Sequence, residues 1–471
     1  MALITSDRAR FPNDPWQLVE TVHLPGNAGT LETLFSLGNG HLGIRGAHWA
    51  AADADLPGSF INGFHETWDI KHAENAYGFA RTGQRILYIP DANNFTVIID
   101  GETLNLDEST VLDYRRSVDF ATGVYECRIT WQCRSGATVT TTERRAVGYE
   151  SRGALGISLE LAADRDVSAD VTSSVINRQD QPVEDHSAHD PRRAGRHAGR
   201  VLLPVRLDGG DGSLRLSWET AESKQRIGLA VDHWTNAGVQ PFDTQVHEDD
   251  SSVRYVLAVG ADEPFVLEKS VSYAVGQTSA DLADDAEAGL RPLADIFAES
   301  AAHYRGYWAT SDIVLAGQTE LQQAVRWNLF QLAQATACAD VAGIPAKGVS
   351  GSGYDGHYFW DQEVYLMPYL TYTSPGSARQ VLEFRHGMLP EAKIRAKELS
   401  VDGALFPWRT INGLEASAYY AAGTAQFHIA AAIAFATNRY SWASGDQEFQ
   451  ESLGSELLIE TARMWASLGF F

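Results

Sequence analysis

Alternation of apolar and polar residues dominates the chain from about residue 80 to 275 and constrains the fold more than any other feature. Apolar side chains occupy every second position in residues 125–131 and again in residues 155–161. A period of two turns one face of a β-strand toward a core and the other toward water. The dipeptide Asp100-Gly101 follows an apolar run and is typical of a tight hairpin turn. Many short strands without intervening helices predict an antiparallel β-sandwich.

The pattern changes after this region. Residues 278–309 are rich in alanine and acidic residues at helical spacing, which predicts linker helices. From about residue 318 apolar residues recur every three or four positions, as in an amphipathic helix. We expect helices near 319–338, 357–373, 375–399, 423–440 and 447–468. The predicted domains are therefore a β-sandwich in 1–275, a helical linker in 276–317 and a helical domain in 318–471.

Charge and composition exclude several classes of partner. The 471 residues contain 37 Lys and Arg against 61 Asp and Glu, a net charge of −24. This acidic field repels phosphate, so we expect neither nucleic acid nor an anionic membrane as a partner. No apolar run reaches the length of a membrane span, and the N-terminus does not resemble a signal peptide. Three cysteines without short paired spacings predict neither a disulfide framework nor a metal site. We expect a cytoplasmic protein.

Two segments concentrate aromatic, acidic and glycine residues: 347–363 and 406–420. Sugars bind with their C–H faces on aromatic rings and their hydroxyls on carboxylates, so Trp360 beside Asp361 fits a sugar site. Trp408 beside Arg409 fits the same chemistry, since a guanidinium donates to hydroxyls or phosphate. In the alternative interpretation, both tryptophans belong to a core, and Asp361 and Arg409 cap helices.

Two further patterns have simpler explanations. Gly351, Gly353 and Gly356 match the G-x-G-x-x-G fingerprint of dinucleotide-binding proteins. No apolar strand precedes them and a Tyr-Phe-Trp run follows, so we reject a nicotinamide site. The segment 186–200 contains three histidines, but its Gly, Pro and Ser residues favour a solvated loop over a metal site.

Several motifs together resemble one enzyme family. Residues 356–363 read GHYFWDQE and residues 406–410 read FPWRT, while residues 32–46 read ETLFSLGNGHLGIRG. With DPW at 14–16 and PGSFING at 57–63, they resemble glycoside hydrolase family 65 in the same order along the chain. That family holds the maltose, trehalose, kojibiose and nigerose phosphorylases.

The resemblance implies an N-terminal antiparallel super-β-sandwich, a helical linker and the first part of an (α/α)6 barrel. It also implies that Trp360 and Asp361 hold the glucosyl unit, with Trp408, Arg409 and His357 lining the same pocket. The family often has Gly-Glu-Glu where this chain reads Gly-Leu-Glu, so Glu415 is the remaining acidic candidate. We take all six as substrate-binding candidates.

The implied reaction is inverting phosphorolysis of an α-linked glucose disaccharide to β-glucose 1-phosphate and a released sugar. Inorganic phosphate is then a co-substrate, and no other cofactor or metal is expected. The family's general acid is a glutamate in a Gly-Pro-Asp-Glu-Tyr segment, which does not occur in this sequence. We therefore expect the general acid beyond Phe471, no catalytic residue within the chain, and no activity from the 471-residue chain alone.

Two alternatives remain open at this stage. One is an α-glucosidase of the same family, such as a trehalose hydrolase, which a second base carboxylate would favour. The other is a non-catalytic carbohydrate-binding remnant. The resemblance further implies a homodimer for the complete enzyme.

Overall fold

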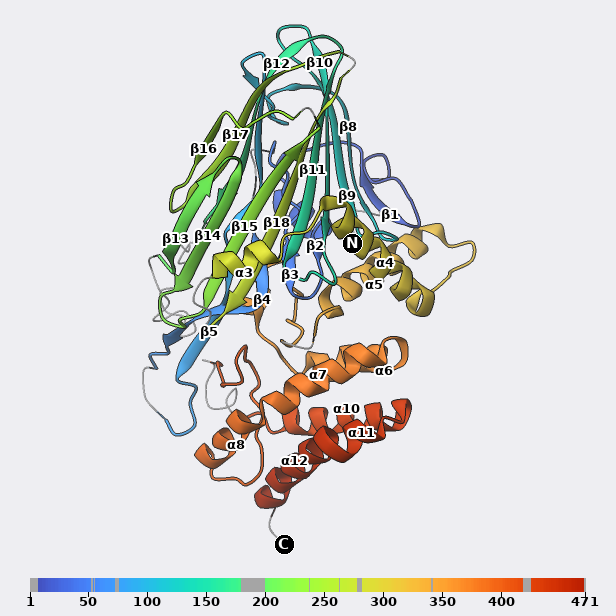
Figure 1. Ribbon diagram of the computed structural model, residues 1–471. Helices are drawn as coiled ribbons and strands as arrows, with labels where there is room; N and C mark the ends of the chain where they lie inside the picture. The colour runs from blue at the N-terminus through green and yellow to red at the C-terminus, as the bar shows by residue number, and fades with distance from the viewer. Residues whose placement is uncertain are drawn as a thin grey trace.

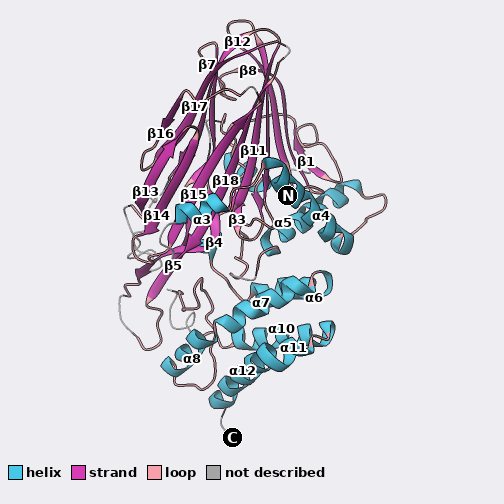
Figure 2. Ribbon diagram, in the orientation of Figure 1, coloured by secondary structure: helices cyan, strands magenta, loops and turns pink. Residues whose placement is uncertain are grey.

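The computed structural model describes residues 7–51, 54, 56–72, 76–178, 200–236, 238–261, 263–277, 282–339, 342–417 and 425–469. In this part of the chain, antiparallel sheets form one end of the molecule and helices form the other (Figure 1, Figure 2). The segment 186–200, predicted to be a loop, lies outside the described residues apart from Arg200.

Three sheets make up the β part. The first has the order β1 (Gln17–Glu20), β8 (Thr110–Asp119), β9 (Tyr125–Gln132), β10 (Thr138–Val147), β11 (Ala154–Ala163), β18 (Phe265–Gly276), β15 (Arg226–Thr235), β14 (Ser213–Thr220) and β13 (Leu202–Gly210). The second has the order β16 (Asp243–Gln245), β17 (Asp250–Val259), β12 (Val167–Ile176), β6 (Asp91–Ile99) and β7 (Glu102–Thr103). The third has the order β2 (Leu37–Gly38), β3 (Leu42–Ile44), β4 (Ser59–Asp69) and β5 (Thr82–Ile89).

The first two sheets pack face to face, as the alternation predicts. Ile157 and Leu159 of β11 share one continuous buried core with Val97 of β6 and Val171 of β12. Strand β9 buries every second residue, because its period of two matches the pleat. The predicted hairpin at Asp100-Gly101 joins β6 to β7, and both residues have positive φ, 49° and 82°, as a type I′ turn requires. The antiparallel sheets are thus confirmed.

The helices that follow the sandwich pack on it rather than merely connecting it. They are α3 (Leu282–Ala288), α4 (Leu293–Ser311) and α5 (Thr319–Thr336), and a short helix α2 (Ala28–Leu34) precedes them in the chain. Trp308 of α4 donates its indole N–H to the carbonyl of Phe120 at 2.6 Å. The ring of Phe120 lies 5.3 Å from that of Phe330 on α5. Helix α5, predicted to begin the helical domain, therefore shares the core of the sandwich.

The remaining helices form a separate layered group below the sandwich in Figure 1. They are α6 (Met367–Thr373), α7 (Pro375–Gly387), α8 (Leu389–Glu398), α10 (His428–Ser444), α11 (Gln447–Phe449) and α12 (Ser455–Leu468). Two π-helical turns, Gln362–Leu366 and Gln450–Gly454, run directly into α6 and α12. Buried side chains of α7, α10 and the segment before α12, including Val381, Ala436 and Phe449, form a core of their own.

Three predicted helices differ from the structure. The helix expected near 423–440 is α10, which begins at His428 and ends at Ser444. The helix expected from 357 begins at Asp361, because Tyr358 is extended and pairs with Thr410. The helix expected over 375–399 divides into α7 and α8 at Met388, just before Pro390, which lacks an N–H to continue the ladder. The proposed boundaries at 275 and 317 stay predictions, although the last strand ends at Gly276.

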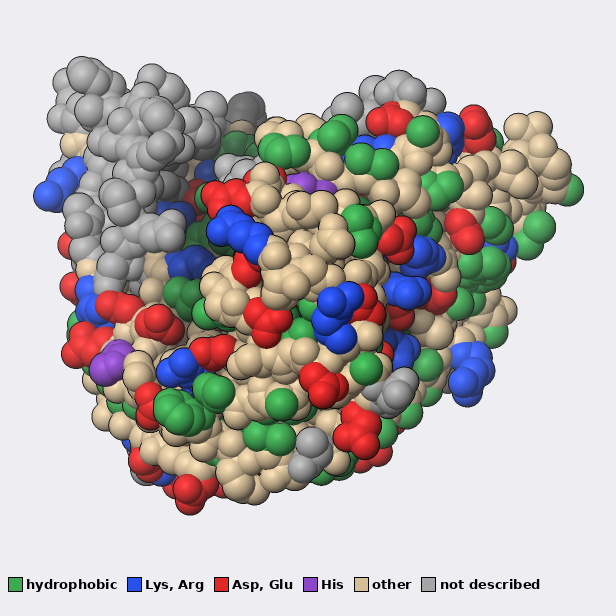
Figure 3. All heavy atoms as spheres, turned by 90° about the horizontal axis from the view of Figure 1, so that it is seen from above, with side chains coloured by type: hydrophobic (Ala, Val, Ile, Leu, Met, Phe, Trp, Pro, Cys, Tyr) green, Lys and Arg blue, Asp and Glu red, His purple; other side chains and the backbone are tan. Residues whose placement is uncertain are grey.

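The three cysteines, all among the described residues, are buried, and none forms a disulfide. Acidic and basic side chains are interspersed over the face seen in Figure 3. In the part of the chain that the structure describes, no helix has both the length and the apolar character of a membrane span.

Candidate functional site

The two segments chosen from the sequence come together in space. Tyr358 N donates to the carbonyl of Thr410 at 2.8 Å, and Thr410 N donates back to Tyr358 at 3.3 Å. This short antiparallel bridge joins loops that lie some fifty positions apart in the chain. Next to it, the rings of Phe359 and Trp408 meet edge to face at 6.0 Å. We refer to residues 347–360 as the first loop and to residues 406–417 as the second loop.

Trp360 and Asp361 stand where the first loop turns into the helical segment. Both are half-buried, so each keeps part of its side chain accessible. The Trp360 ring lies edge to face against His428, the first residue of α10, at 4.6 Å. Among the described residues, the Asp361 carboxylate has no hydrogen bond or ion pair, and it does not cap the helical turn that it precedes. The interpretation of Asp361 as a helix cap is therefore wrong, and its oxygens are available to a ligand.

A buried ion pair holds the backbone just before Trp360. Glu363 accepts from Arg385 Nε at 2.8 Å and from Nη2 at 2.9 Å, and both side chains are fully buried. The same Nη2 donates to the carbonyl of Phe359 at 2.9 Å. A fixed guanidinium fork thus connects α7 to the residue beside Trp360. Sequence reasoning missed this contact, because nothing local distinguishes Arg385 from Arg379, the other arginine of the same helix.

Arg409 is turned toward the first loop. Its Nη2 lies 2.5 Å from the Asp355 carboxylate and 3.3 Å from the carbonyl of Tyr354. Tyr354 and Asp355 both adopt the left-handed region, with φ of 53° and 56°, which costs free energy in residues other than glycine. Arg409 helps to hold that conformation. It is 8% exposed, so the structure gives it a loop-organising position at the edge of the predicted sugar site.

His357 lies beneath the site. Its side chain is only 1% exposed, and Nδ1 lies 2.8 Å from the carbonyl of Tyr354. Burial and the nearby Arg409 lower its pKa to about 3, so the imidazole is neutral at physiological pH. Its Nε2 has no hydrogen-bond partner among the described residues, and the substrate contact expected of His357 stays a prediction.

Glu415 is also used by the protein itself. One carboxylate oxygen accepts from Trp408 N at 2.7 Å and the other from Ser417 N at 2.9 Å. Burial raises its pKa to about 7, although these backbone N–H groups oppose the shift. Glu415 therefore shapes the second loop and sets the backbone of Trp408. As a direct sugar ligand it is a poorer candidate than Asp361.

The sandwich supports the first loop from below. Tyr358 Oη donates to Asn62 Oδ1 at 2.8 Å, and Asn62 Nδ2 donates to the carbonyl of Gly343 at the same distance. The backbone of Gly43 runs so close to Val349 that an added Cβ would lie 1.9 Å from the Val349 carbonyl oxygen. In the sequence, the strand that contains Gly43 stood out only through the family resemblance. Its packing partner, Val349, lies some three hundred residues further along the chain.

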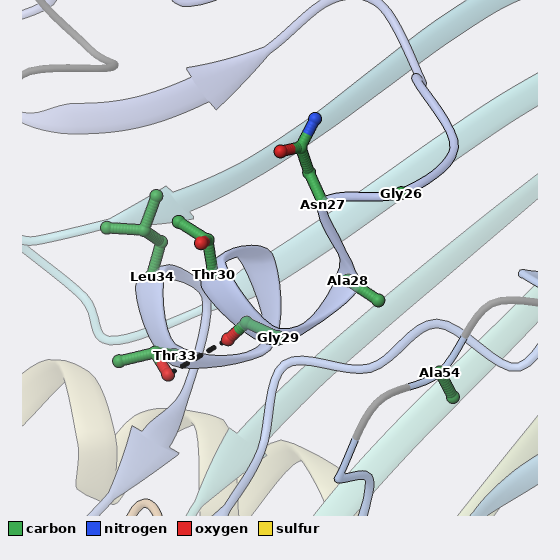
Figure 4. A pocket seen from close by; sticks show the side chains of 8 residues that line it. All are labelled: Gly26, Asn27, Ala28, Gly29, Thr30, Thr33, Leu34 and Ala54. Carbon is green, nitrogen blue, oxygen red and sulfur yellow. Dashed lines mark hydrogen bonds between the residues drawn. The ribbon is translucent and has the colours of Figure 1, made fainter.

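The described residues also line two hollows away from Trp360. One, of about 810 Å³, lies beside α2 and is lined by small residues such as Thr30 and Ala54, with no charged side chain (Figure 4). In this hollow, Thr33 Oγ1 donates a hydrogen bond to the carbonyl of Gly29 in the same helix. The other, of about 580 Å³, lies between the sandwich and α7–α8 and includes His65 and Asn412. Neither contains the candidate pair Trp360 and Asp361.

Comparison with known proteins identifies the family. Residues 18–311 match the model of the glycosyl hydrolase family 65 N-terminal domain, and residues 326–471 match that of the family 65 central catalytic domain. The chain belongs to glycosyl hydrolase family 65. The resemblance seen in the motifs is thereby confirmed.

Family 65 relatives cover almost the whole chain. An uncharacterized glycosyl hydrolase of Mycobacterium tuberculosis is 33% identical over 99% of this chain and 60% of its own length. The alpha,alpha-trehalose phosphorylase of Thermoanaerobacter brockii is 31% identical over 98% of this chain and 61% of its own length. The kojibiose phosphorylase of Halothermothrix orenii is 26% identical, covering 96% and 59%. The chain thus spans about three fifths of the length of the curated family 65 relatives it matches.

A solved structure agrees with the fold. A protein from the human microbiome with the provisional name of kojibiose phosphorylase superposes with a TM-score of 0.86 at 25% identity. The match covers 98% of this chain and 60% of that one. The mixed architecture of antiparallel sheets followed by helices is therefore that of a family 65 protein.

Proposed function

We propose that an enzyme containing this chain carries out inverting phosphorolysis of an α-linked glucose disaccharide, producing β-glucose 1-phosphate and a released sugar. The observation that carries the proposal is the carboxylate of Asp361. It is half-buried, it has no protein partner among the described residues, and it adjoins the Trp360 ring. Trehalose and kojibiose phosphorylases among the relatives support the reaction class.

Asp361 and Trp360 together suit a glucosyl unit. A carboxylate accepts hydrogen bonds from two neighbouring hydroxyls, and an aromatic ring packs against the C–H face of a pyranose. Trp408 lies beside Phe359 and extends the aromatic surface, while Arg409 and Glu415 fix the loop that carries Trp408. We assign ligand contact to Trp360, Asp361 and Trp408, and loop positioning to the other two.

In the proposed reaction, an oxygen of inorganic phosphate attacks the anomeric carbon from the face opposite the leaving sugar. The new carbon–oxygen bond forms as the glycosidic bond breaks, and a glutamic acid transfers its proton to the departing oxygen. Phosphate is itself an anionic nucleophile, so no base is needed to activate water. The relatives extend beyond the part matched here, and we assign the general acid to that further part, since Glu363 and Glu415 are already bound by the protein.

Several features of the whole enzyme follow as part of the same proposal. Helices α6 to α12 would be the first part of an (α/α)6 barrel, with the loops before α6 and α10 at its substrate end. Phosphate is the co-substrate and no metal or organic cofactor takes part. The complete enzyme is a cytoplasmic homodimer.

The test is an assay of the purified full-length enzyme with trehalose, kojibiose, nigerose and maltose, each with and without phosphate. Proton NMR follows the anomeric configuration of the first product. We expect β-glucose 1-phosphate from one of these sugars only when phosphate is present, and its loss in an Asp361→Ala variant. Formation of α-glucose 1-phosphate would contradict the inverting mechanism.

The second candidate is hydrolysis by an α-glucosidase, favoured by the uncharacterized glycosyl hydrolase among the relatives. The same assay separates the two reactions. Release of two free sugars at a rate independent of phosphate would establish hydrolysis and rule out phosphorolysis. Binding without turnover would point to a carbohydrate-binding protein.

A further inference from the structure

We propose that Gln84 and His65, two residues of the third sheet, are positioning residues that hold the second loop in its sugar-binding conformation through Asn412. The proposal deepens the function proposed above and rests on it. It assigns to the β part a direct share in the geometry of the substrate site, although neither residue touches the candidate sugar ligands.

Gln84 grips the backbone of the second loop from β5. Its side chain is 1% exposed. Its Oε1 accepts from Ile411 N at 2.5 Å and, more weakly, from Asn412 N at 3.4 Å. Its Nε2 donates to Asn412 Oδ1 at 2.8 Å and to the carbonyl of Leu414 at 3.4 Å. The one side-chain amide thus forms hydrogen bonds with Ile411, Asn412 and Leu414. An apolar side chain has no donor or acceptor with which to replace them.

His65 holds the other side of the same asparagine. Its Nδ1 lies 2.7 Å from the carbonyl of Gly63, and a carbonyl only accepts, so Nδ1 carries the proton. Its Nε2 therefore presents a lone pair, and Asn412 Nδ2 donates to it at 3.5 Å. Gln225 Oε1 accepts from His65 N at 2.8 Å and keeps this strand in place. Burial lowers the pKa of His65, in agreement with the neutral ring that this tautomer needs.

The contacts act at a turn that otherwise has short-range hydrogen bonds of its own, among them one from Leu414 N to Asn412 Oδ1 at 3.1 Å. Gly413 has a φ of 95°, a conformation open mainly to glycine, and its N–H is taken by Thr410 Oγ1. The turn at 412–414 is thus a tight reversal whose outer residues, Asn412 and Leu414, are exposed. Thr410 itself pairs with Tyr358, so a shift of the turn is transmitted to the bridge between the two loops.

The sugar candidates lie on either side of this turn. Trp408 lies four residues before Asn412, and Glu415, which accepts from Trp408 N, directly follows Leu414. The turn therefore brings the Glu415 carboxylate back to Trp408 N, and this contact orients the Trp408 backbone. Since an aromatic platform works only when its face is aligned with the sugar, releasing the turn should weaken sugar binding without removing any ligand contact.

The experiment compares the unaltered chain with Gln84→Met and Asn412→Leu, which remove the hydrogen bonds while keeping similar volume. Asn412 is exposed, so the second variant folds even if the buried Gln84→Met change proves too costly. Asn39→Leu is the matched control. Its buried amide makes four hydrogen bonds, all within the sandwich, to Gly148, Arg152, His41 and Leu42.

Two measurements are made on each protein. Hydrogen–deuterium exchange follows peptides covering 406–417 and, for comparison, α7. Calorimetric titration with glucose, trehalose and kojibiose measures binding. In both loop variants we expect exchange in 406–417 to be about tenfold faster, exchange in α7 to be unchanged, and binding to weaken about tenfold. Asn39→Leu should change neither the exchange in 406–417 nor the sugar affinity, even though it lowers the melting temperature.

The outcomes separate the two proposals. Unchanged exchange in 406–417 would overturn the positioning role, and so would faster exchange with unaltered sugar affinity. If the unaltered protein bound none of the three sugars, the proposed function would fail, while the exchange data would still decide whether Gln84 and Asn412 hold the loop.

Discussion

The buried pair of Glu363 and Arg385 offers the sharpest test of how the candidate site is held. Arg385→Met removes the guanidinium and leaves the Glu363 carboxylate fully buried without its counter-charge. It also removes the donor to the Phe359 carbonyl, next to Trp360. Glu363→Leu removes the other partner, and the double substitution replaces the ion pair by two apolar side chains.

The structure sets the expected magnitude. Two charge-assisted hydrogen bonds of 2.8 and 2.9 Å are lost, and a charge with no access to water remains. Breaking such a pair from one side costs about 3–5 kcal/mol, whereas replacing both partners is often close to neutral. Each single change should therefore lower the free energy of unfolding strongly, and the double change should recover most of that loss.

Urea unfolding followed by far-UV circular dichroism, which reports on the helices, measures these differences. Arg379→Met on the same helix is the matched control. Arg379 pairs with Glu383 at 2.8 Å, with Asp446 at 3.0 Å and with Glu448 at 3.6 Å, but Arg379 itself is 29% exposed, in contrast to the fully buried Arg385. An ion pair in contact with water contributes about 1 kcal/mol or less. A loss from Arg385→Met no larger than from Arg379→Met, or no recovery in the double variant, would refute the reasoning.

Three further predictions concern the site and its support. Asp361→Ala in the full-length enzyme should lower kcat/KM by an amount equivalent to roughly 2–4 kcal/mol of transition-state binding, with an unchanged melting temperature because Asp361 bonds to no described residue. Unaltered kcat/KM would remove Asp361 from the substrate site. Gly43→Ala should lower the melting temperature strongly, because the new Cβ would lie 1.9 Å from the Val349 carbonyl oxygen. Gly210→Ala is the control: its added Cβ would have no atom within 4 Å, so the melting temperature should stay unchanged. Burial raises the pKa of Glu415 from 4.5 to about 7, so the folded state binds the extra proton between these values. Stability should therefore fall as pH rises through this window, and a Glu415→Gln variant, measured by urea unfolding at several pH values, should lose that part of the slope. An identical slope in both proteins would contradict the raised pKa.

The sequence by itself determined the classes of structure and the place of the chemistry. An alternating pattern such as that of β9 can bury its apolar residues only in a sheet, and Asp100-Gly101 can close a hairpin because both residues tolerate positive φ. These are local requirements, legible within ten residues. The aromatic and acidic motifs around Trp360 and Trp408 were equally local, and they carried the family resemblance that the matches over residues 18–311 and 326–471 confirm.

Tertiary structure alone decided what each of those residues does. His357, adjacent in sequence to the candidates, is buried, and Glu415 is occupied by backbone N–H groups of its own loop. Asp361, whose residue type suits a cap equally well, is left without a partner in the described part of the chain. Sequence adjacency does not reveal which side of a loop faces solvent, since that depends on what packs beneath it.

The supporting contacts were the least predictable. Gln84 donates to Asn412, more than three hundred residues away in the chain. Arg385 forms the buried ion pair and Arg379 does not, because only Arg385 points into the core of the helical part. No periodicity or motif encodes such pairings, because each depends on the final packing of the sandwich against the helices. Local patterns therefore specified the elements and the two loops, whereas long-range burial specified which side chains hold them and which remain for the substrate.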